Sequence, residues 1–309
     1  MNKPKKLRLV FDAAAQAEGV SLNSVLLSGP DLCQLLTTIF MKFRQKAIGV
    51  CGDILEMFHQ VEIRREDQNS QRFLWRRNTN EVISEYVMSV MTFGATCSPC
   101  SVQFVKNKNA EEFQAAFPNA VKAIIDNDYV DDFVHCFSTP EEAVQTTNEV
   151  RWIHKQGGFD LKRFVSNAKS VTEQLNGDAA TAADFSLDKD GFPKVLGMYW
   201  DTAEDILKFA LILSKVDKAV VNGERRPTKR EALGIAMSVF DPFGLASEIT
   251  LAAKLVLQAV WRRKTEWDES IPKDAYEMWL KWVKMLEQIQ NLSILRCYDE
   301  NFQWSYTCS

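Results

Sequence analysis

The chain has 309 residues, enough for two or three domain-sized units, and its 46% hydrophobic and 25% charged residues are typical of a globular protein. A formal net charge of −4 and a pI near 5.6 argue against a protein that binds nucleic acid over its whole surface. Seven cysteines, an odd number, and only three histidines argue against a disulfide framework and a histidine-rich metal site.

No segment of the sequence predicts export or membrane insertion. The basic N-terminus is not followed by a long apolar run, so no signal peptide is indicated. The most apolar later stretch, residues 251–261, contains Lys254 and Gln258 and is too short to span a bilayer. We therefore predict an intracellular protein that is not secreted.

The first half of the chain predicts strands with a helix between them. A strand around residues 50–61 carries Asp53, and the segments 71–77 and 85–93 predict a hairpin because they are rich in aromatic and β-branched residues. Ser98, followed by Pro99, predicts the N-cap of a helix that ends near residue 117. Cys97 and Cys100 nearby have the CxxC spacing, but no second pair accompanies them, which argues against zinc or redox chemistry.

The second half changes from mixed structure to helices. A strand, turn and strand around Asp131 precede a helix that a capping box at Thr139 begins and the glycines at 157–158 end. Segments 193–201 and 206–213 predict a strand pair. A second capping box at Thr228 begins a helix that stops at 241–242, and amphipathic helices are expected near 246–264 and 273–290. This order predicts an α+β fold, in which both early helices cover one face of an antiparallel sheet and leave the other open.

Two adjacent carboxylates stand out in "NDYVDDFVHCF", residues 127–137. One interpretation is a solvated turn, because Asp is a common turn residue. The other is a divalent metal site, because burial raises the pKa of neighbouring carboxylates unless a cation compensates. If the strand that carries Asp53 lies beside this turn, three carboxylates meet at one end of the sheet, as two-metal phosphoryl transfer requires.

Five segments in order resemble the polymerase motifs of reverse transcriptases from long-terminal-repeat retroelements, most closely those of the BEL/Pao retrotransposon family. They are "DILEMFHQV" (53–61), "MTFGATCSPCSVQF" (91–104), "YVDD" (129–132), "GGFDLKRFVSN" (157–167) and "VLGMYW" (195–200). Residues 229–249 are similar to the stretch that follows the polymerase in BEL/Pao polyproteins. The resemblance implies a right-hand polymerase, with fingers and an antiparallel-sheet palm in residues 1–212 and an α-helical thumb and connection region in residues 213–309.

The resemblance also implies a metal site and its ligands. Asp53 and Asp131 would hold two Mg²⁺ ions, for which Mn²⁺ could substitute. Asp132 would lie beside them, and the backbone carbonyl of Ile54 would be a further ligand. These three aspartates would be the catalytic residues.

Other motif positions imply contacts with the substrates. Phe58 matches the steric gate beneath the incoming sugar, although a core position is the alternative. Phe93 and Gly94 match residues that flank the nascent base pair. The remaining assignments are Arg8, on the triphosphate or simply at the surface; Lys162 or Lys169, of which one protonates the leaving pyrophosphate; and Gly197 and Trp200, in the primer grip.

The function that follows is RNA-directed DNA synthesis, with an RNA or DNA template, a primer and a deoxynucleoside triphosphate (dNTP) as partners, in the cytoplasmic particles of a retroelement. The sequence gives no indication of the oligomeric state. Basic clusters at 72–77 and 225–230 are expected to contact template-primer phosphates. Because no protease motif occurs and the chain ends early, we expect a fragment truncated before RNase H. The alternatives are a catalytically silent relic that still binds nucleic acid and a metal-dependent phosphotransferase of another fold.

Overall fold

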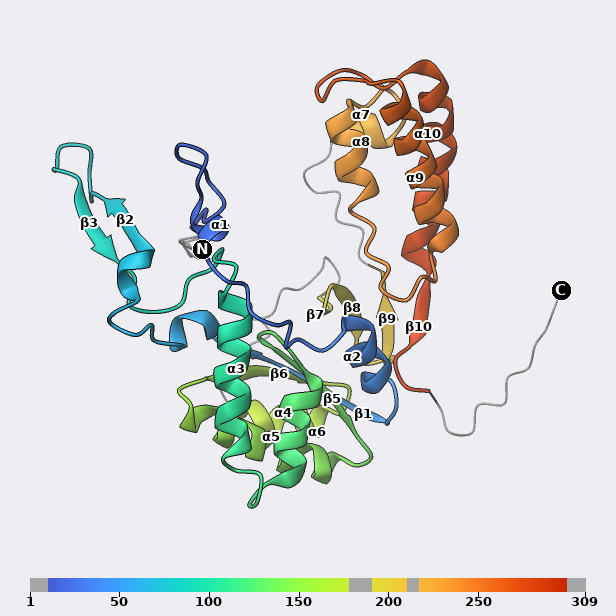
Figure 1. Cartoon of the computed structure of the whole chain (residues 1–309). Helices are drawn as coiled ribbons and strands as arrows, with labels where there is room; N and C mark the ends of the chain where they lie inside the picture. The colour runs from blue at the N-terminus through green and yellow to red at the C-terminus, as the bar shows by residue number, and fades with distance from the viewer. Residues whose placement is uncertain (1–10, 178–190, 210–216, 299–309) are drawn as a thin grey trace. The chain divides into compact units, whose positions relative to one another are not determined.

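The computed structural model in Figure 1 describes residues 11–177, 191–209 and 217–298. These residues group into two compact units. The first unit contains residues 11–35, 50–164 and 170–177, and the second contains residues 36–49, 165–169, 191–209 and 217–298. Chain segments from both halves of the sequence therefore contribute to each unit. The expected boundary near residue 212 between palm and thumb stays a prediction.

A four-stranded sheet with the order β4-β5-β1-β6 carries the carboxylates. Its strands are β1 (Ile48–Ile54), β4 (Asp128–Tyr129), β5 (Asp132–Phe137) and β6 (Leu161–Ser166). Most residues of β1 and β5 are buried, which explains why neither strand shows a strict alternation of apolar and polar residues. The strand expected over 50–61 ends earlier, because Glu56 turns the chain at a φ of 49° into the 3-10 helix η1 (Met57–Gln60).

Three helices pack together in the first unit (Figure 1). They are α3 (Ser98–Glu111), α4 (Pro118–Asn127) and α5 (Pro140–Gln156), and α4 and α5 also contact β5. The prediction of one helix from 98 to about 117 is wrong at both ends. Cys97 is the N-cap in place of Ser98, and α3 ends at Glu111. The separate helix α4, which the sequence did not predict, begins at Pro118, since proline suits the first turn of a helix and not its interior.

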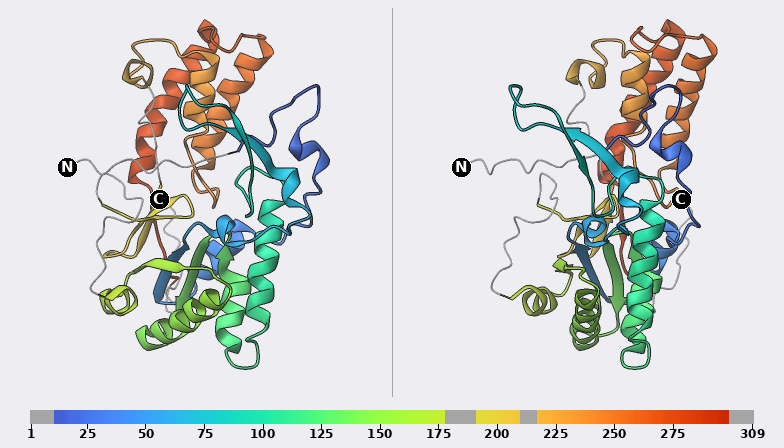
Figure 2. Two further views of the ribbon diagram at one scale, coloured as in Figure 1. Left: turned by 90° about the vertical axis from the view of Figure 1, so that its left-hand side faces the viewer. Right: turned by 60° about the vertical axis from the view of Figure 1, so that its left-hand side comes forward.

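The remaining elements of the first unit are short. The strands β2 (Arg72–Trp75) and β3 (Ser84–Val87) form the predicted hairpin, with Arg72 paired to Val87. Figure 2 shows this hairpin extending away from α3 as a two-stranded arm. The unit also contains α1 (Leu22–Val25), η2 (Gln68–Gln71) and α6 (Lys169–Asn176), whose first residue belongs to the second unit.

The second unit combines an antiparallel sheet with helices. The sheet has the order β10-β9-β8-β7, from β7 (Lys194–Val195), β8 (Met198–Asp201), β9 (Ile206–Lys208) and β10 (Ser293–Leu295). Its helices are α2 (Leu36–Phe43), α7 (Lys218–Val221), α8 (Lys229–Ala236), α9 (Ser247–Arg262), α10 (Lys273–Leu286) and the 3-10 helix η5 (Glu287–Asn291). The capping box at Thr228 and the two amphipathic helices after it are confirmed. The strand β10 was not predicted; it follows the helices and pairs with β9.

In the part of the chain that the structure describes, none of the helices combines the length and the apolar character needed to cross a bilayer.

Candidate active site

Backbone pairing brings the first and third motifs together. The amide of Ile54, the last residue of β1, donates a 2.8 Å hydrogen bond to the carbonyl oxygen of Asp131. Asp132 begins β5 and pairs with Tyr129 across the hairpin. The strand order places β5 directly beside β1, so Ile54 and Asp131, 77 positions apart in sequence (131 − 54), lie at neighbouring backbone positions. Asp53, Asp131 and Asp132 are all half-buried.

The turn that carries Asp131 is strained. Only Val130 and Asp131 connect the paired residues Tyr129 and Asp132. Val130 has a φ of +56°, a region that a β-branched residue rarely adopts. Such conformations persist only where the surrounding structure enforces them, and they cluster at functional sites.

The carboxylates repel one another. Burial, together with the nearby charges of Asp131, Asp53 and Asp128, raises the pKa of Asp132 to about 7. One cation compensates part of this charge, since Nη1 of Arg163 lies 3.1 Å from Oδ2 of Asp53. The site is therefore a half-buried group of negative charges, one of which contacts an arginine.

A fully buried ion pair lies directly before the β4–β5 turn. Nζ of Lys106, on α3, is 2.8 Å from Oδ2 of Asp128, and Nε2 of His154, on α5, is 3.3 Å from the same oxygen. All three side chains are 0% exposed. Burial alone would raise the pKa of Asp128, but the charge of Lys106 and the contact with His154 outweigh it and hold that pKa below its usual range. Side chains of helices α3 and α5 thereby both contact Asp128, the first residue of β4.

Two of the expected substrate residues are in contact. The ring centroids of Phe58 and Phe93 are 4.6 Å apart, and Phe58 is 8% exposed. Gly94 has a φ of +102°, and a Cβ there would lie 2.2 Å from the carbonyl oxygen of Phe11. The position therefore requires glycine. The side chain of Asn23 donates a 2.9 Å hydrogen bond to the Gly94 carbonyl and accepts a 2.8 Å hydrogen bond from the Thr96 amide, which stabilises this segment.

The fourth-motif lysines do not contact Asp53 in the way that Arg163 does. Nζ of Lys162 pairs with Oδ2 of Asp160 at 2.5 Å, and its side chain is exposed. Lys169 is the first residue of α6 and belongs to the other compact unit. Arg8, expected at the triphosphate, lies outside the described residues.

The expected primer-grip residues lie on the β7–β8 hairpin of the second unit. Leu196 and Gly197 form its two-residue turn with φ values of +46° and +96°, a combination typical of a type I′ turn. A Cβ on Gly197 would lie 2.7 Å from the ring of Phe240. Trp200 is fully buried, and its Nε1 donates to Oδ1 of Asp205 at 2.9 Å. In this structure Trp200 supports the hairpin from the core side.

The carboxylates are chemically suited to a hard divalent cation. Mg²⁺ binds a few carboxylates together with substrate phosphates and water, and the mutual repulsion at Asp132 is what such a cation relieves. Within the described ranges, however, no three or more His, Cys, Asp or Glu side chains are gathered closely enough to hold a metal ion. The ligand atoms have the chemistry and the charge that Mg²⁺ requires. The Asp53 carboxylate, however, accepts a hydrogen bond from Arg163.

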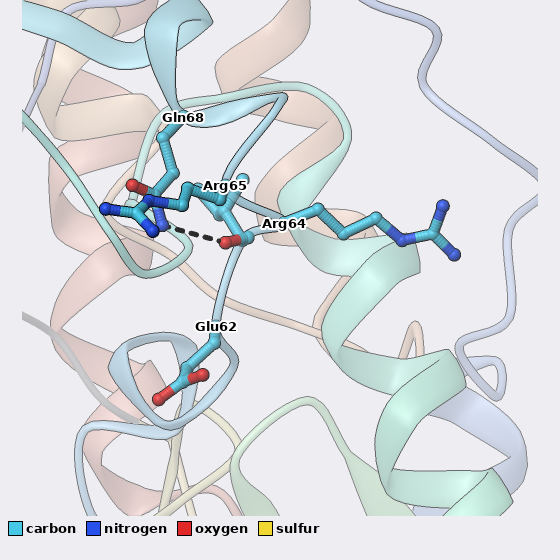
Figure 3. A pocket seen from close by; sticks show the side chains of 5 residues that line it. Glu62, Arg64, Arg65 and Gln68 are labelled. Atoms are coloured by element: carbon cyan, nitrogen blue, oxygen red, sulfur yellow. Dashed lines mark hydrogen bonds between the residues drawn. The ribbon is translucent and has the colours of Figure 1, made fainter.

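An open pocket of about 410 Å³ lies just after the first motif (Figure 3). It is lined by Glu62, Ile63, Arg64, Arg65 and Gln68. Arg65 lies beside Gln68, which donates to the Ile63 carbonyl at 3.0 Å, whereas Arg64 points away from them. Because none of the three aspartates lines this pocket, the site is defined by the carboxylates and not by the cavity.

Sequence reasoning missed three features of the site. Arg163 stands next to Lys162 in the fourth motif, and weighing every basic residue there would have included it. The pair of Lys106 with Asp128 and the bracing contacts of Asn23 gave no local signal, since their partners are 22 and 71 residues away in sequence.

Comparison with known proteins finds two family models that match this chain. Residues 12–172, more than half of the chain, match the family model described as reverse transcriptase (RNA-dependent DNA polymerase). Residues 228–307 match the model of the Pao retrotransposon-like RNaseH-like domain. The described residues of that second stretch form helices α8 to α10, the 3-10 helix η5 and strand β10. A search of curated proteins finds no match.

Two similar solved structures are foamy viral proteins. The protease-reverse transcriptase dRH in complex with double-stranded DNA superposes with a TM-score of 0.53 at 15% identity, over 93% of this chain and 43% of that one. The protease-reverse transcriptase in complex with an RNA/DNA hybrid gives a TM-score of 0.54 at 16% identity, over 88% of this chain and 31% of that one. The chain thus spans less than half the length of these relatives, and at this identity the likeness concerns the fold. The predicted right-hand polymerase fold is confirmed.

The chain therefore belongs to the reverse transcriptase (RNA-dependent DNA polymerase) family, within the BEL/Pao retrotransposon group.

Proposed function

We propose that the chain is an RNA-directed DNA polymerase of a retrotransposon. A primer 3′-hydroxyl attacks the α-phosphate of a dNTP, a new phosphodiester bond forms, and pyrophosphate leaves. The observation that carries the proposal is the pairing of Ile54 with Asp131 beside Asp132, which brings the first and third motifs to neighbouring backbone positions.

The proposed metal ligands are the carboxylates of Asp53 and Asp131 and the carbonyl of Ile54, with Asp132 beside them. When bound, two Mg²⁺ or Mn²⁺ ions would activate the attacking oxygen and stabilise the leaving one. The protein's own part is to hold the carboxylates, through the β4–β5 turn and the Lys106–Asp128 pair, before the substrates arrive.

The proposed partners are a template with its primer and a dNTP. The two foamy viral relatives were solved with nucleic acid duplexes, which supports template-primer binding here. Phe58, in contact with Phe93, is the proposed steric gate beneath the sugar. Retroelement particles in the cytoplasm are the proposed location.

Primer extension by the parent and by Asp131→Asn tests the proposal. The substitution keeps the size of the side chain and removes the charge that binds the metal, so extension should fall by about three orders of magnitude while the fold survives. Asp274→Asn is the matched control, because Asp274, on α10, forms an exposed ion pair with Arg263 at the end of α9. Equal extension rates for the parent and Asp131→Asn would contradict the proposal. A parent that binds template-primer without extending it would favour the catalytically silent relic.

A further inference from the structure

An arginine of the fourth motif contacts one of the proposed metal-binding carboxylates. Nη1 of Arg163 lies 3.1 Å from Oδ2 of Asp53, and their side chains are 37% and 30% exposed. The contact joins residues 110 positions apart, so it is formed by the pairing of β6 with β1 and not by local structure.

The backbone of β6 is distorted at this contact. Arg163 has a φ of +58°, a conformation that costs a non-glycine residue free energy. The burial pattern changes at the same point, because Leu161, Phe164 and Ser166 are buried. A regular strand would bury residues two apart throughout. The alternation of buried and exposed residues is therefore interrupted by one extra residue between Leu161 and Phe164.

The neighbouring residues Lys162 and Arg163 consequently form ion pairs with different carboxylates. Lys162 pairs with Asp160, and Arg163 pairs with Asp53. The charges of Asp131, Asp53 and Asp128 act on Asp132, and Lys106 pairs with Asp128. Arg163 therefore places a positive charge directly on the Asp53 carboxylate.

We propose that Arg163 is the internal counter-ion of Asp53, which neutralises this carboxylate in the metal-free protein and has to release it before a divalent cation binds there. The inference rests on the proposed function, since it takes Asp53 as a metal ligand. A guanidinium suits this role, because it stays charged at every physiological pH and binds carboxylates in a fixed geometry. It is unsuited to donate a proton to pyrophosphate, so the role differs from that of a general acid.

The proposal makes Arg163 a competitor of the metal. Removing its charge frees the Asp53 carboxylate, so the affinity for the metal should rise. A charged contact at a partly exposed site corresponds to a change of about five- to tenfold in affinity. Arg163→Lys keeps the charge but loses the planar two-nitrogen geometry, so its affinity should lie between those of the parent and Arg163→Gln.

The test measures Mn²⁺ binding to the whole, metal-free chain by electron paramagnetic resonance of free Mn²⁺. Arg163→Gln should bind Mn²⁺ about five- to tenfold more tightly than the parent. Lys162→Gln is the matched control, since it removes the neighbouring charge from Asp160 and should change the affinity less than twofold. The Mn²⁺-induced rise in the thermal midpoint should also be larger for Arg163→Gln than for the parent. Should Arg163→Gln fail to fold, the Mn²⁺ affinity of Arg163→Lys tests the proposal in its place, with a smaller increase expected.

Equal or weaker Mn²⁺ binding by a folded Arg163 variant overturns the proposal. Asp53→Asn separates this failure from that of the proposed function. If the parent binds Mn²⁺ through Asp53 and the Arg163 variants bind no tighter, the counter-ion role alone is wrong. If neither the parent nor Arg163→Gln binds Mn²⁺, both proposals fail. If Arg163→Gln binds more tightly but the parent extends no primer, the counter-ion role stands and the polymerase proposal fails.

Discussion

At the scale of single residues, the site region contains two aspartates in opposite electrostatic situations. Asp128 is fully buried and paired with Lys106, which keeps it charged. Asp132, four residues later, is surrounded by other carboxylates, which together with burial raise its pKa. The same residue type therefore serves as a structural anchor at one position and as a candidate metal ligand at the other.

The sugar preference of the proposed polymerase activity is expected to depend on Phe58. Phe58→Val should open space beneath the incoming sugar and raise ribonucleotide use relative to deoxyribonucleotide use by roughly 10²-fold, about 2.7 kcal/mol of discrimination. The measurement is the ratio of kcat/KM for a dNTP and its ribonucleotide counterpart on one RNA template. Phe104→Val, at a ring that is 53% exposed on α3, is the control. An unchanged ratio would mean that Phe58 is only a core residue.

The buried ion pair is expected to dominate the stability of the first unit. Lys106→Met leaves the Asp128 carboxylate buried without its cation, which should lower the free energy of unfolding by about 3–5 kcal/mol. Lys108→Met removes an exposed pair with Glu111 on the same helix and should cost less than about 1 kcal/mol. Urea unfolding monitored by circular dichroism compares the two. Similar losses of unfolding free energy in the two variants would contradict a dominant role for the buried pair. The double variant Lys106→Met, Asp128→Asn should recover part of the stability that Lys106→Met loses.

At the scale of elements, side chains near the ends of helices and strands determine where each begins. Thr228 and Glu231 form a complete capping box on α8, and Arg225 donates to both Glu231 and Asp217. Thr139 accepts from the Glu142 amide at the start of α5. These interactions connect residues three to eight positions apart, which is why the starts of α5 and α8 could be predicted from sequence.

The α8 capping box should make stability depend on pH in the acid range. The hydrogen bond from Arg225 is the main reason that the pKa of Glu231 falls to about 2. A lowered pKa contributes stability above the unfolded value near 4.5, and this contribution is lost as the pH falls from there towards 2. Glu231→Gln should therefore be less stable than the parent at pH 6, and the difference should shrink by pH 2.5.

Urea titrations at several pH values, followed by tryptophan fluorescence, measure this difference. Glu224→Gln is a control on the adjacent segment, since Glu224 accepts from the side-chain amide of Asn222 and not from an arginine. A difference between the parent and Glu231→Gln that stays constant from pH 6 to 2.5 would refute the linkage.

At the scale of the whole molecule, contacts between segments that are distant in sequence hold the second unit together. Arg296 is fully buried in the second unit, where it donates to Asp205 and to the carbonyls of Phe43, Lys46 and Ala47. Its guanidinium also lies over the rings of Phe43 and Trp200. The residue just after β10 thus joins the loop before β1 to the turn that follows β8.

Template-primer binding should be electrostatic and should depend most on arginines whose charge is not already neutralised. Arg225 and Arg230 are held by carboxylates, whereas Arg76, on the β2–β3 hairpin, donates to the Thr79 carbonyl. Replacing Arg76 and Arg77 by Gln should reduce the slope of log K against log salt concentration by about 0.7–0.9 for each phosphate that the protein no longer neutralises. Arg230→Gln should change the slope less. Fluorescence anisotropy across a salt series measures it, and a slope unchanged by the hairpin double variant would exclude the hairpin from the interface.

The sequence by itself determined the family, the order of the motifs and the starts of α5 and α8, because these depend on residue types a few positions apart. It also identified Asp53, Asp131 and Asp132 as candidates for the metal site. Only the tertiary structure decided that Arg163 and not Lys162 contacts Asp53, and that Lys106 and Arg296 are buried anchors. Their partners lie 110, 22 and 91 residues away, and no local pattern specifies which distant carboxylate a cation will meet. That choice is made by strand pairing and helix packing, which bring the side chains together only when the chain has folded.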